Sequence, residues 1–588
     1  MKRGSLIVSF LLFTIAVAVS QRPDIRTPEQ TVRPIVDRTV RETAFELQPV
    51  PLKPALEIQV VDFRAWALTP AGDMVYARSC ITSDRDTILR FGMSRDLPIK
   101  IVLNSGVVFS SDRTTRFVFR EVGYEIFRFN DTLSFPIRKG RNELLVKARP
   151  IGNRNVMYLR EITPVGKRPV SSFDLSADDP SLKGKSWMYL SGFGGLKKPS
   201  LRVPLAPDSI YRSSYLWNGA QLSWRFPEQQ TVMGLRIKPE ATYRRESYAE
   251  WQYPNGTVML SLQSYADAAQ DTLVRSFVQA FCNFTVNNLE MFRTQYERLH
   301  DFRGTNHKLI RQGMLDDTGA PALPFIEQMV RSHDPRFESI VADVARYVST
   351  GQLRLRDGTF CRYEKIPGTV WADDLFMSAP FLVRMGRLKG GTKFFDDAAR
   401  QAVNFNKYLE DKGTGLYRHG WYDAEKRQSP IAWGRANGWV IWAMTEILKD
   451  LPKSHPQRNH VVTIFRRHMK SIVSFQAASG LWHQVLDRPD SFEETSCTAM
   501  FIIGMARGMQ MGILDRSFEP ALQKAWSGLQ SKVSDDGVVK DICRGTEMGE
   551  DFDFYNRRER FDNDPRGLGA VITACVEMMT MKNSLGRQ

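Results

Sequence analysis

Residues 415–439 read GLYRHGWYDAEKRQSPIAWGRANGW. The stretch opens with a turn signal and ends where an apolar helix begins. It also concentrates side chains that bind sugars, because indole rings stack on sugar faces while carboxylates, imidazoles, guanidinium groups and amides hydrogen-bond to hydroxyls. These side chains are His419, Trp421, Asp423, Trp433, Arg435, Asn437 and Trp439.

The same kind of helix start recurs along the second half of the chain. Polar or aromatic residues precede an apolar run near residues 255, 316, 373, 435, 494 and 564, a repeat of roughly 60 residues. Second helices predicted at 393–410, 458–476 and 519–532 make each unit a helical hairpin. Six hairpins can bury all of their apolar faces by closing into two concentric rings. We therefore predict a mainly α protein with an (α/α)6 barrel over residues 236–588.

A barrel of this kind brings the start of every inner helix to the same rim. Side chains that are far apart in the sequence then face one cavity, and the positive helix ends point into it. The predicted rim residues are Asn255, Asp373, Asp423, Arg435, Glu494 and Asp564.

The first 235 residues differ from the rest in composition and in hydrophobic pattern. Residues 1–20 combine Lys2 and Arg3 with an apolar run and a small-residue cleavage pattern, which predicts a signal peptide. Residues 21–55 are rich in Pro, Arg and Thr without periodicity, and we expect an extended arm or linker there. Residues 56–235 predict a β-sandwich resembling a jelly roll, with strands at 55–61, 87–91, 99–103, 115–119 and 142–146 and a bridging segment after 165. Its role, structural or carbohydrate-binding, stays open.

Charge and cysteine usage restrict the partners. The net charge of +16 is spread along the chain without a nucleic-acid motif, so an acidic oligosaccharide is the expected partner and nucleic acid is not. The six cysteines lack zinc or redox spacing, and we expect no metal, no cofactor and mostly buried free thiols. No later stretch has the length of a membrane helix, so we expect a secreted or periplasmic protein without membrane insertion. The oligomeric state is open.

Glycoside hydrolysis commonly needs two carboxylates. Asp423 and Asp373 lie beside aromatic residues at adjacent repeats, and we predict that they are catalytic, although an aspartate at the position of Asp373 can also cap its helix. A second group at the fifth repeat is predicted to bind the sugar. It comprises Trp482, His483 and Gln484, while Arg435 and Arg566 are candidates for a substrate carboxylate.

A series of motifs carries a family resemblance. The motifs are WADDLFMSAPFL at 371–382, HGWYD at 419–423, WGRANGW at 433–439, LWHQVLD at 481–487, EETSCTAMF at 493–501, GTEMG at 545–549 and NDPRGLG at 563–569. In this order they resemble the unsaturated rhamnogalacturonyl and glucuronyl hydrolases of glycoside hydrolase families 105 and 88. The resemblance covers about residues 240–588 and implies the same (α/α)6 barrel.

The resemblance also implies a chemistry. The substrate is a lyase product whose terminal uronic acid has a C4–C5 double bond; an aspartate protonates C4, water adds at C5, and the hemiketal opens to release the rest of the glycan. By resemblance the acid is Asp423 and the second carboxylate is Asp373. Two departures stand out: Tyr422 interrupts the H-x-W-D pattern, and Arg566 replaces the usual histidine.

The residues themselves leave two other functions open. One is two-carboxylate hydrolysis of saturated glycans by the same barrel. The other is a glycan-binding protein without catalysis. Release of a saturated sugar, or binding without product, would distinguish these from the unsaturated uronyl hydrolase.

Overall fold

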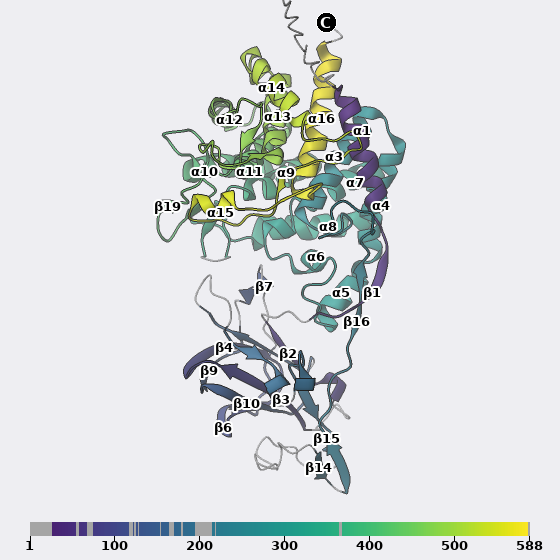
Figure 1. Cartoon of the computed structure of the whole chain (residues 1–588), viewed down its shortest axis with the longest axis vertical. Coiled ribbons are helices and arrows are strands. Elements are labelled where there is room, and N and C mark those ends of the chain that lie inside the picture. Colours follow the sequence, from purple (N-terminus) through teal and green to yellow (C-terminus); the bar gives the residue numbers. More distant parts are fainter. Residues whose placement is uncertain are drawn as a thin grey trace, which may run out of the picture.

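The structure is a computed structural model that describes residues 26–585, except 54–57, 67–73, 117–120, 123–124, 127–128, 153, 164–169, 178–179, 194–213, 218 and 364–366. The predicted signal peptide lies outside the described residues, as do parts of two predicted strands. The helices form one part of the molecule and the sheets of the N-terminal half form another (Figure 1).

Six helices form a closed inner ring in the described part of the chain. Each packs against the next, and the last returns to the first. They are α3 (Tyr253–Ala269), α7 (Leu323–Ser332), α9 (Asp374–Lys389), α11 (Gly434–Asp450), α13 (Thr495–Gln510) and α16 (Pro565–Leu585). Most of these helices are buried on nearly all sides, as expected for the interior layer of a two-layer barrel.

Five outer helices each follow an inner helix and pack against it. They are α4 (Thr272–Asn287), α8 (Pro335–Arg346), α10 (Lys393–Leu409), α12 (Arg458–Ser474) and α14 (Glu519–Gln530). Each buries one face, for example Val274, Val278 and Phe281 of α4. The helices predicted at 393–410, 458–476 and 519–532 are confirmed to within two residues at each end.

The sixth outer helix comes from the N-terminal segment. Residues 28–42 form α1 (Pro28–Glu42), which begins with a capping box made by Thr27 and Gln30 and packs against α16. Val32, Ile35 and Val36 are fully buried in the main core of the barrel. The prediction of an extended arm over 21–55 is therefore wrong for residues 28–42. The segment has three apolar residues at helical spacing, but its high proline and arginine content suggested an irregular structure.

The predicted helix starts agree with the structure at five of the six repeats. The exception is the one placed at residue 316. There a short 3-10 turn (Leu315–Asp317) precedes the inner helix, which begins only at Leu323. Further short helices lie at the barrel ends: α5 (Leu289–Arg298), α6 (His307–Arg311) and α15 (Phe552–Asn556).

The loops at the inner-helix starts contain short antiparallel strands. β17 (Thr369–Trp371), β18 (Gly420–Tyr422) and β19 (Arg427–Gln428) form a three-stranded sheet that joins two neighbouring units. Two further pairs are β20 (Trp482–His483) with β21 (Glu493–Glu494), and β22 (Ile542–Cys543) with β23 (Arg560–Phe561). These strands hold the rim segments in register with one another.

The N-terminal half contains antiparallel sheets. One has the order β12-β3-β10-β5-β6 with β13 also paired to β3, and the other has the order β2-β11-β4-β9. Buried side chains from both share one apolar cluster, such as Val146 of the first sheet and Phe91 of the second. The strands are β2 (Gln59–Asp62), β3 (Val75–Ser83), β4 (Thr87–Arg95), β5 (Ile99–Leu103), β6 (Gly106–Ser111), β9 (Asp131–Ile137), β10 (Gly140–Ala148), β11 (Val156–Glu161), β12 (Ser172–Phe173) and β13 (Met188–Leu190).

A two-stranded ribbon joins the two parts. β1 (Leu47–Pro51) pairs with β16 (Thr231–Leu235), so the chain leaves the helical ring and returns to it side by side. Tyr158 of β11 packs against Phe302, which follows α5. The described remainder of the bridging segment forms the hairpin of β14 (Ser214–Trp217) and β15 (Ala220–Ser223), and β7 (Glu121–Val122) pairs with β8 (Glu125–Ile126).

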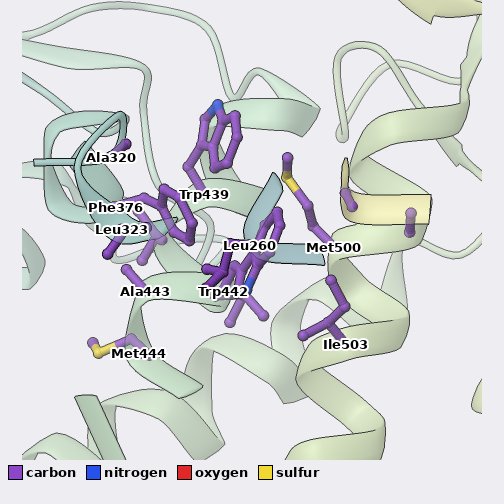
Figure 2. Close-up of a cluster of buried hydrophobic side chains, with 14 of the residues drawn as sticks. Leu260, Ala320, Leu323, Phe376, Trp439, Trp442, Ala443, Met444, Met500 and Ile503 are labelled. Carbon is purple, nitrogen blue, oxygen red and sulfur yellow. The ribbon is translucent and has the colours of Figure 1, made fainter. Parts of the chain in front are cut away.

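The centre of the ring is filled by side chains rather than open. Leu260, Leu323, Phe376, Trp442 and Ile503, from five different inner helices or their starts, come together in one apolar cluster (Figure 2). Trp439 lies at the edge of this cluster, with its ring nitrogen pointing away from the other labelled side chains. The interior of the barrel is therefore a packed apolar core at this level.

A belt of buried ion pairs lies toward the other end of the ring. Glu446 of α11 is 2% exposed and contacts both Arg384 of α9, at 2.9 Å, and Arg507 of α13. Arg384 also contacts Glu327 of α7 at 2.7 Å, and Arg507 contacts Glu577 of α16 at 2.7 Å. The belt thus links five of the six inner helices through alternating charges.

The six cysteines are all buried and none is in a disulfide, which confirms the expectation of free thiols. Among the described residues, no helix is both long enough and apolar enough to cross a membrane.

Candidate active site

The inner helices begin around a polar rim. Gln252, Asp373 and Trp433 occupy the positions just before α3, α9 and α11, and none of their side chains makes a capping hydrogen bond. The first-turn N–H groups of these helices therefore keep their positive ends directed at the rim. Side chains gathered around these three starts form the candidate site.

Asp373 is the carboxylate at the centre of this rim. Its side chain is 14% exposed, and its Oδ2 lies 3.3 Å from His419 Nε2, without a well-aligned hydrogen bond to either atom in the described chain. Burial acts to raise the pKa of Asp373, but His419, Arg362 and Arg435 together hold this pKa below its ordinary value. The carboxylate does not cap α9, so the alternative of a helix cap does not explain it.

His419 is held from behind by a residue that the sequence did not single out. The hydroxyl of Tyr555 lies 2.6 Å from His419 Nδ1 and also accepts a hydrogen bond from the N–H of Gly549 at 3.0 Å. The hydroxyl proton is then available for Nδ1, which leaves the ring proton of a neutral His419 on Nε2, facing Asp373. Burial lowers the pKa of His419 and raises that of Tyr555, so both are neutral near pH 7.

Trp433 and Arg435 lie next to His419 in the site. Trp433 lies 4.6 Å from His419 ring to ring, and the guanidinium of Arg435 lies 4.7 Å from the Trp433 ring. Arg435 is 1% exposed and donates to the carbonyls of Cys543 and Arg544, while its Nε has no hydrogen-bond partner in the described chain. Gln484 accepts from Trp433 Nε1 at 3.1 Å.

Two further side chains bring unpartnered polar atoms to the start of α3 and α11. Trp439 Nε1 and Asn255 Oδ1 are buried without a hydrogen-bond partner in the described chain. Tyr253 lies 6.1 Å from Trp439, and burial raises the pKa of its hydroxyl, with Arg566, Arg435, Asp316 and Asp373 as its charged neighbours. A buried polar atom without a partner is costly, and a cluster of them is typical of a site completed by a ligand.

A second carboxylate was missed at the sequence level. Asp316 stands in the 3-10 turn before α7 and accepts from Arg362 at 3.0 Å. The same guanidinium pairs with the buried Asp374 at 2.6 Å. Burial raises the pKa of Tyr253, and the charges of Asp316 and Asp373 both add to this effect. The doublet Asp316–Asp317 was identified in the sequence only as a helix start.

Arg566 is committed to protein carboxylates. It contacts Glu246 and Asp564, each at 3.1 Å, and Tyr243 Oη at 3.1 Å. Burial raises the pKa of Asp564 against the effect of Arg566. The charge of Arg566 is therefore already neutralised by carboxylates, whereas the direct partners of Arg435 among the described residues are two carbonyl oxygens.

Several residues predicted to bind substrate make hydrogen bonds within the rim. Glu494 is fully buried and accepts from the N–H groups of Cys497 and Cys543, which ties α13 to β22. Asn437 uses its whole amide on Tyr417, Trp433 and His468. Trp482 donates to the carbonyl of Ile472, and His483 bonds to that of Ser491 inside the β20–β21 segment.

The structure does not place Asp423 beside Asp373. In the β17–β18 sheet, Ala372 bonds to His419 and Gly368 bonds to Asp423, so the two ends of the ladder are four residues, roughly 13 Å, apart. Asp423 pairs with Lys426 at 2.8 Å and accepts from Trp421 at 3.3 Å, and Trp421 packs against Tyr408. Asp423, Lys426 and Tyr408 line a separate groove on the outer side of the rim.

Tyr422 stands three residues after His419, at the position where the H-x-W-D pattern has its aspartate, and its side chain faces inward. Its ring packs with Trp371 and Met548, and its hydroxyl donates to Glu550 at 2.5 Å. The inserted residue thus turns Asp423 to the other face of β18, since side chains alternate along a strand. Among the described residues, no group of three or more His, Cys, Asp or Glu side chains is arranged to hold a metal ion.

Comparisons with known proteins identify the family of the helical part. Residues 231–582 match the family model described as Glycosyl Hydrolase Family 88. The chain belongs to this family. It is accordingly a glycoside hydrolase related to the unsaturated rhamnogalacturonyl and glucuronyl hydrolases, as the motif series indicated.

Two curated relatives are similar over most of their length. An unsaturated rhamnogalacturonyl hydrolase of Bacillus subtilis is 30% identical over 43% of this chain and 73% of its own. An unsaturated 3S-rhamnoglycuronyl hydrolase of an Alteromonas species is 26% identical over 54% of this chain and 75% of its own.

Solved structures support the fold. A family 105 glycoside hydrolase of C. acetobutylicum aligns with a TM-score of 0.50 at 24% identity, covering 56% of this chain and 94% of its own. A possible family 105 member of Salmonella enterica aligns with a TM-score of 0.51 at 22% identity, covering 59% and 88%. The shared part corresponds in extent to the helical barrel.

Proposed function

We propose that this protein removes the terminal Δ4,5-unsaturated uronic acid from oligosaccharides produced by polysaccharide lyases. The observation that carries the proposal is Asp373, a largely buried carboxylate that caps no helix and lies 3.3 Å from His419 at the rim. The names of the curated relatives, which act on unsaturated rhamnogalacturonyl or rhamnoglycuronyl substrates, support the same class.

Asp373, rather than Asp423, is the proton donor in this proposal. The resting carboxylate is ionised, because its pKa is held low by His419, Arg362 and Arg435. An arriving uronate carboxylate adds negative charge next to it and raises its pKa, so that it takes up a proton. It delivers this proton to C4 of the enol ether, and the carboxylate left behind accepts a proton from the water that adds to C5. The hemiketal then opens and releases the remaining glycan.

The other rim residues bind and orient in this scheme. His419 and Arg435 are the nearest donors for the uronate, and Trp433 forms the apolar side of the pocket. Asp316 is placed to hold a sugar hydroxyl or the attacking water, because the 3-10 turn brings it near Tyr253 and Arg362. We further propose that the paired sheets form a jelly-roll-like sandwich and that the protein is secreted or periplasmic.

The test uses the ultraviolet absorbance of the unsaturated uronate. The protein is incubated with the products of pectin, ulvan and glycosaminoglycan lyases, and the absorbance should disappear with at least one of them. Persistence of the absorbance with all three, or release of a saturated sugar without loss of absorbance, would contradict the proposal. Comparing Asp373→Asn with Asp423→Asn decides the proton donor, since the larger loss of turnover identifies it.

A further inference from the structure

The outer side of the rim contains a second depression that the catalytic scheme does not use. This groove has a volume of about 570 Å³, within the range of small-molecule binding sites. It is lined by Leu355, Arg356, Asp357, Lys407, Tyr408, Asp423 and Lys426. We call these seven residues the outer groove.

The outer groove combines cations with an aromatic side chain. Its three cations outnumber its two carboxylates, and Tyr408 stands beside Trp421 with ring centroids 5.4 Å apart. Aromatic faces stack on sugar rings, while guanidinium and ammonium groups bind carboxylates and sulfates. This combination fits an anionic sugar better than a neutral one.

The two lysines are fixed but keep donors to spare. Lys407 lies 3.0 Å from Asp357, which also accepts from Tyr408 at 2.7 Å, and Lys426 lies 2.8 Å from Asp423. Each ammonium has three N–H groups, and the two lysine side chains are 60% and 70% exposed. The carboxylates therefore orient the lysines without using up their donors.

Arg356 is the side chain that most favours an anionic ligand in the groove. It is exposed, and in the described part of the chain it has neither an ion-pair nor a hydrogen-bond partner. A planar guanidinium can bind a carboxylate or a sulfate through two parallel hydrogen bonds. The neighbouring Asp357 is occupied by Lys407 and Tyr408 and does not neutralise it directly.

We propose that the outer groove binds a second anionic sugar of the same glycan, bearing a carboxylate or a sulfate, beyond the bond that is cleaved. This inference rests on the proposed function. The segment from His419, in the active site, to Asp423, in the groove, contains β18 and spans roughly 13 Å along the ladder, a distance that an oligosaccharide bridges and a single terminal sugar does not. The groove therefore favours longer acidic substrates over an unsaturated disaccharide.

The experiment compares Arg356→Gln with wild type on an unsaturated disaccharide and an unsaturated tetrasaccharide from the same lyase digest. The ratio of kcat/KM for the tetrasaccharide to that for the disaccharide should fall about tenfold in Arg356→Gln, the value of one charge-assisted contact. The control is Arg516→Gln, an exposed arginine that pairs with Glu519 on the outer layer and should leave the ratio unchanged. An equal ratio in wild type and Arg356→Gln overturns the proposal. Digests of a uronate-rich and a sulfated polysaccharide show which anion is taken.

A direct binding measurement separates failure of this inference from failure of the proposed function. Saturated trigalacturonate, which lacks the reactive double bond, is titrated calorimetrically into wild type and Arg356→Gln at low and high salt. Binding that is about tenfold weaker in the variant and weaker at high salt supports the groove, even if no lyase product is hydrolysed. If lyase products are turned over with the same tetrasaccharide-to-disaccharide ratio of kcat/KM, and trigalacturonate binds equally to both proteins, the proposed role of the groove is wrong. The proposed function then stands.

Discussion

The two ends of the inner ring differ in how their buried charges are paired. Toward the helix ends, the carboxylate of Glu446 forms ion pairs with two guanidinium groups, those of Arg384 and Arg507, although its Oε2 makes no well-aligned hydrogen bond. At the helix starts, Asp373 Oδ2, His419 Nε2 and Trp439 Nε1 are buried without a well-aligned partner in the described residues. Because unpaired buried groups cost free energy, the first end is built for stability and the second for a ligand.

The largest expected effect is on catalysis at the start of α9. Asp373→Asn removes the charge but keeps the shape, and we expect kcat to fall about 10³-fold because the proton donor is lost. The thermal midpoint should not fall, since one buried charge is removed. Initial rates from absorbance and a thermal melt measure both. Asp423→Asn, in the outer groove, should lose far less; a greater loss there than in Asp373→Asn would return the catalytic role to Asp423.

The matching change at the other end should affect stability instead. Glu446→Gln leaves Arg384 and Arg507 without their shared counterion, and we expect a loss of about 3 kcal/mol in the free energy of unfolding with little change in KM. Urea unfolding measures the loss. The control Glu519→Gln breaks the exposed pair with Arg516 and should cost less than about 1 kcal/mol. Equal losses in the two variants would refute the role of the belt.

The two ends should also respond differently to pH. Burial lowers the pKa of His419 below its ordinary value of 6.5, so the unfolded chain takes up a proton before the folded one, and stability falls as pH decreases below about 6.5. The comparison of pH 6.5 with pH 5.0 spans the range in which this loss begins. The pKa of Glu446 is lowered from 4.5, so its contribution is lost only at lower pH. Urea unfolding at both pH values should show a smaller loss for His419→Gln than for wild type; equal losses would contradict this.

The smallest effect tests the hydroxyl behind His419. Tyr555→Phe removes the bond to Nδ1, frees the ring to exchange tautomers, and should lower kcat about tenfold with KM little changed. The acidic limb of the pH–rate profile should shift as well. Tyr417→Phe is the matched control, because it also deletes a buried hydroxyl bond, to Asn406 at 2.8 Å, but one remote from Asp373. If both variants lose kcat equally, Tyr555 has only a structural role.

The periodicity of the sequence was enough to predict the barrel. Apolar runs in hairpins of about 60 residues have few ways to bury their faces, so the ring and most helix starts followed from the pattern. The helix at residues 28–42 could not be predicted from this pattern, because the partner of α1 is α16, at the far end of the chain. Val32, Ile35 and Val36 could have signalled a helix by their spacing, but nothing local says what it packs against.

The site was predicted only in part for the same reason. The sequence by itself determined which residue types gather at the rim, since each repeat places its polar residues just before an apolar helix. Only the tertiary structure decided which of them meet: Tyr555 reaches His419 across 136 residues, and one inserted tyrosine sends Asp423 to the opposite face of β18. Repeats and burial are properties of short segments, whereas the approach of two side chains depends on strand register and on the packing of distant helices.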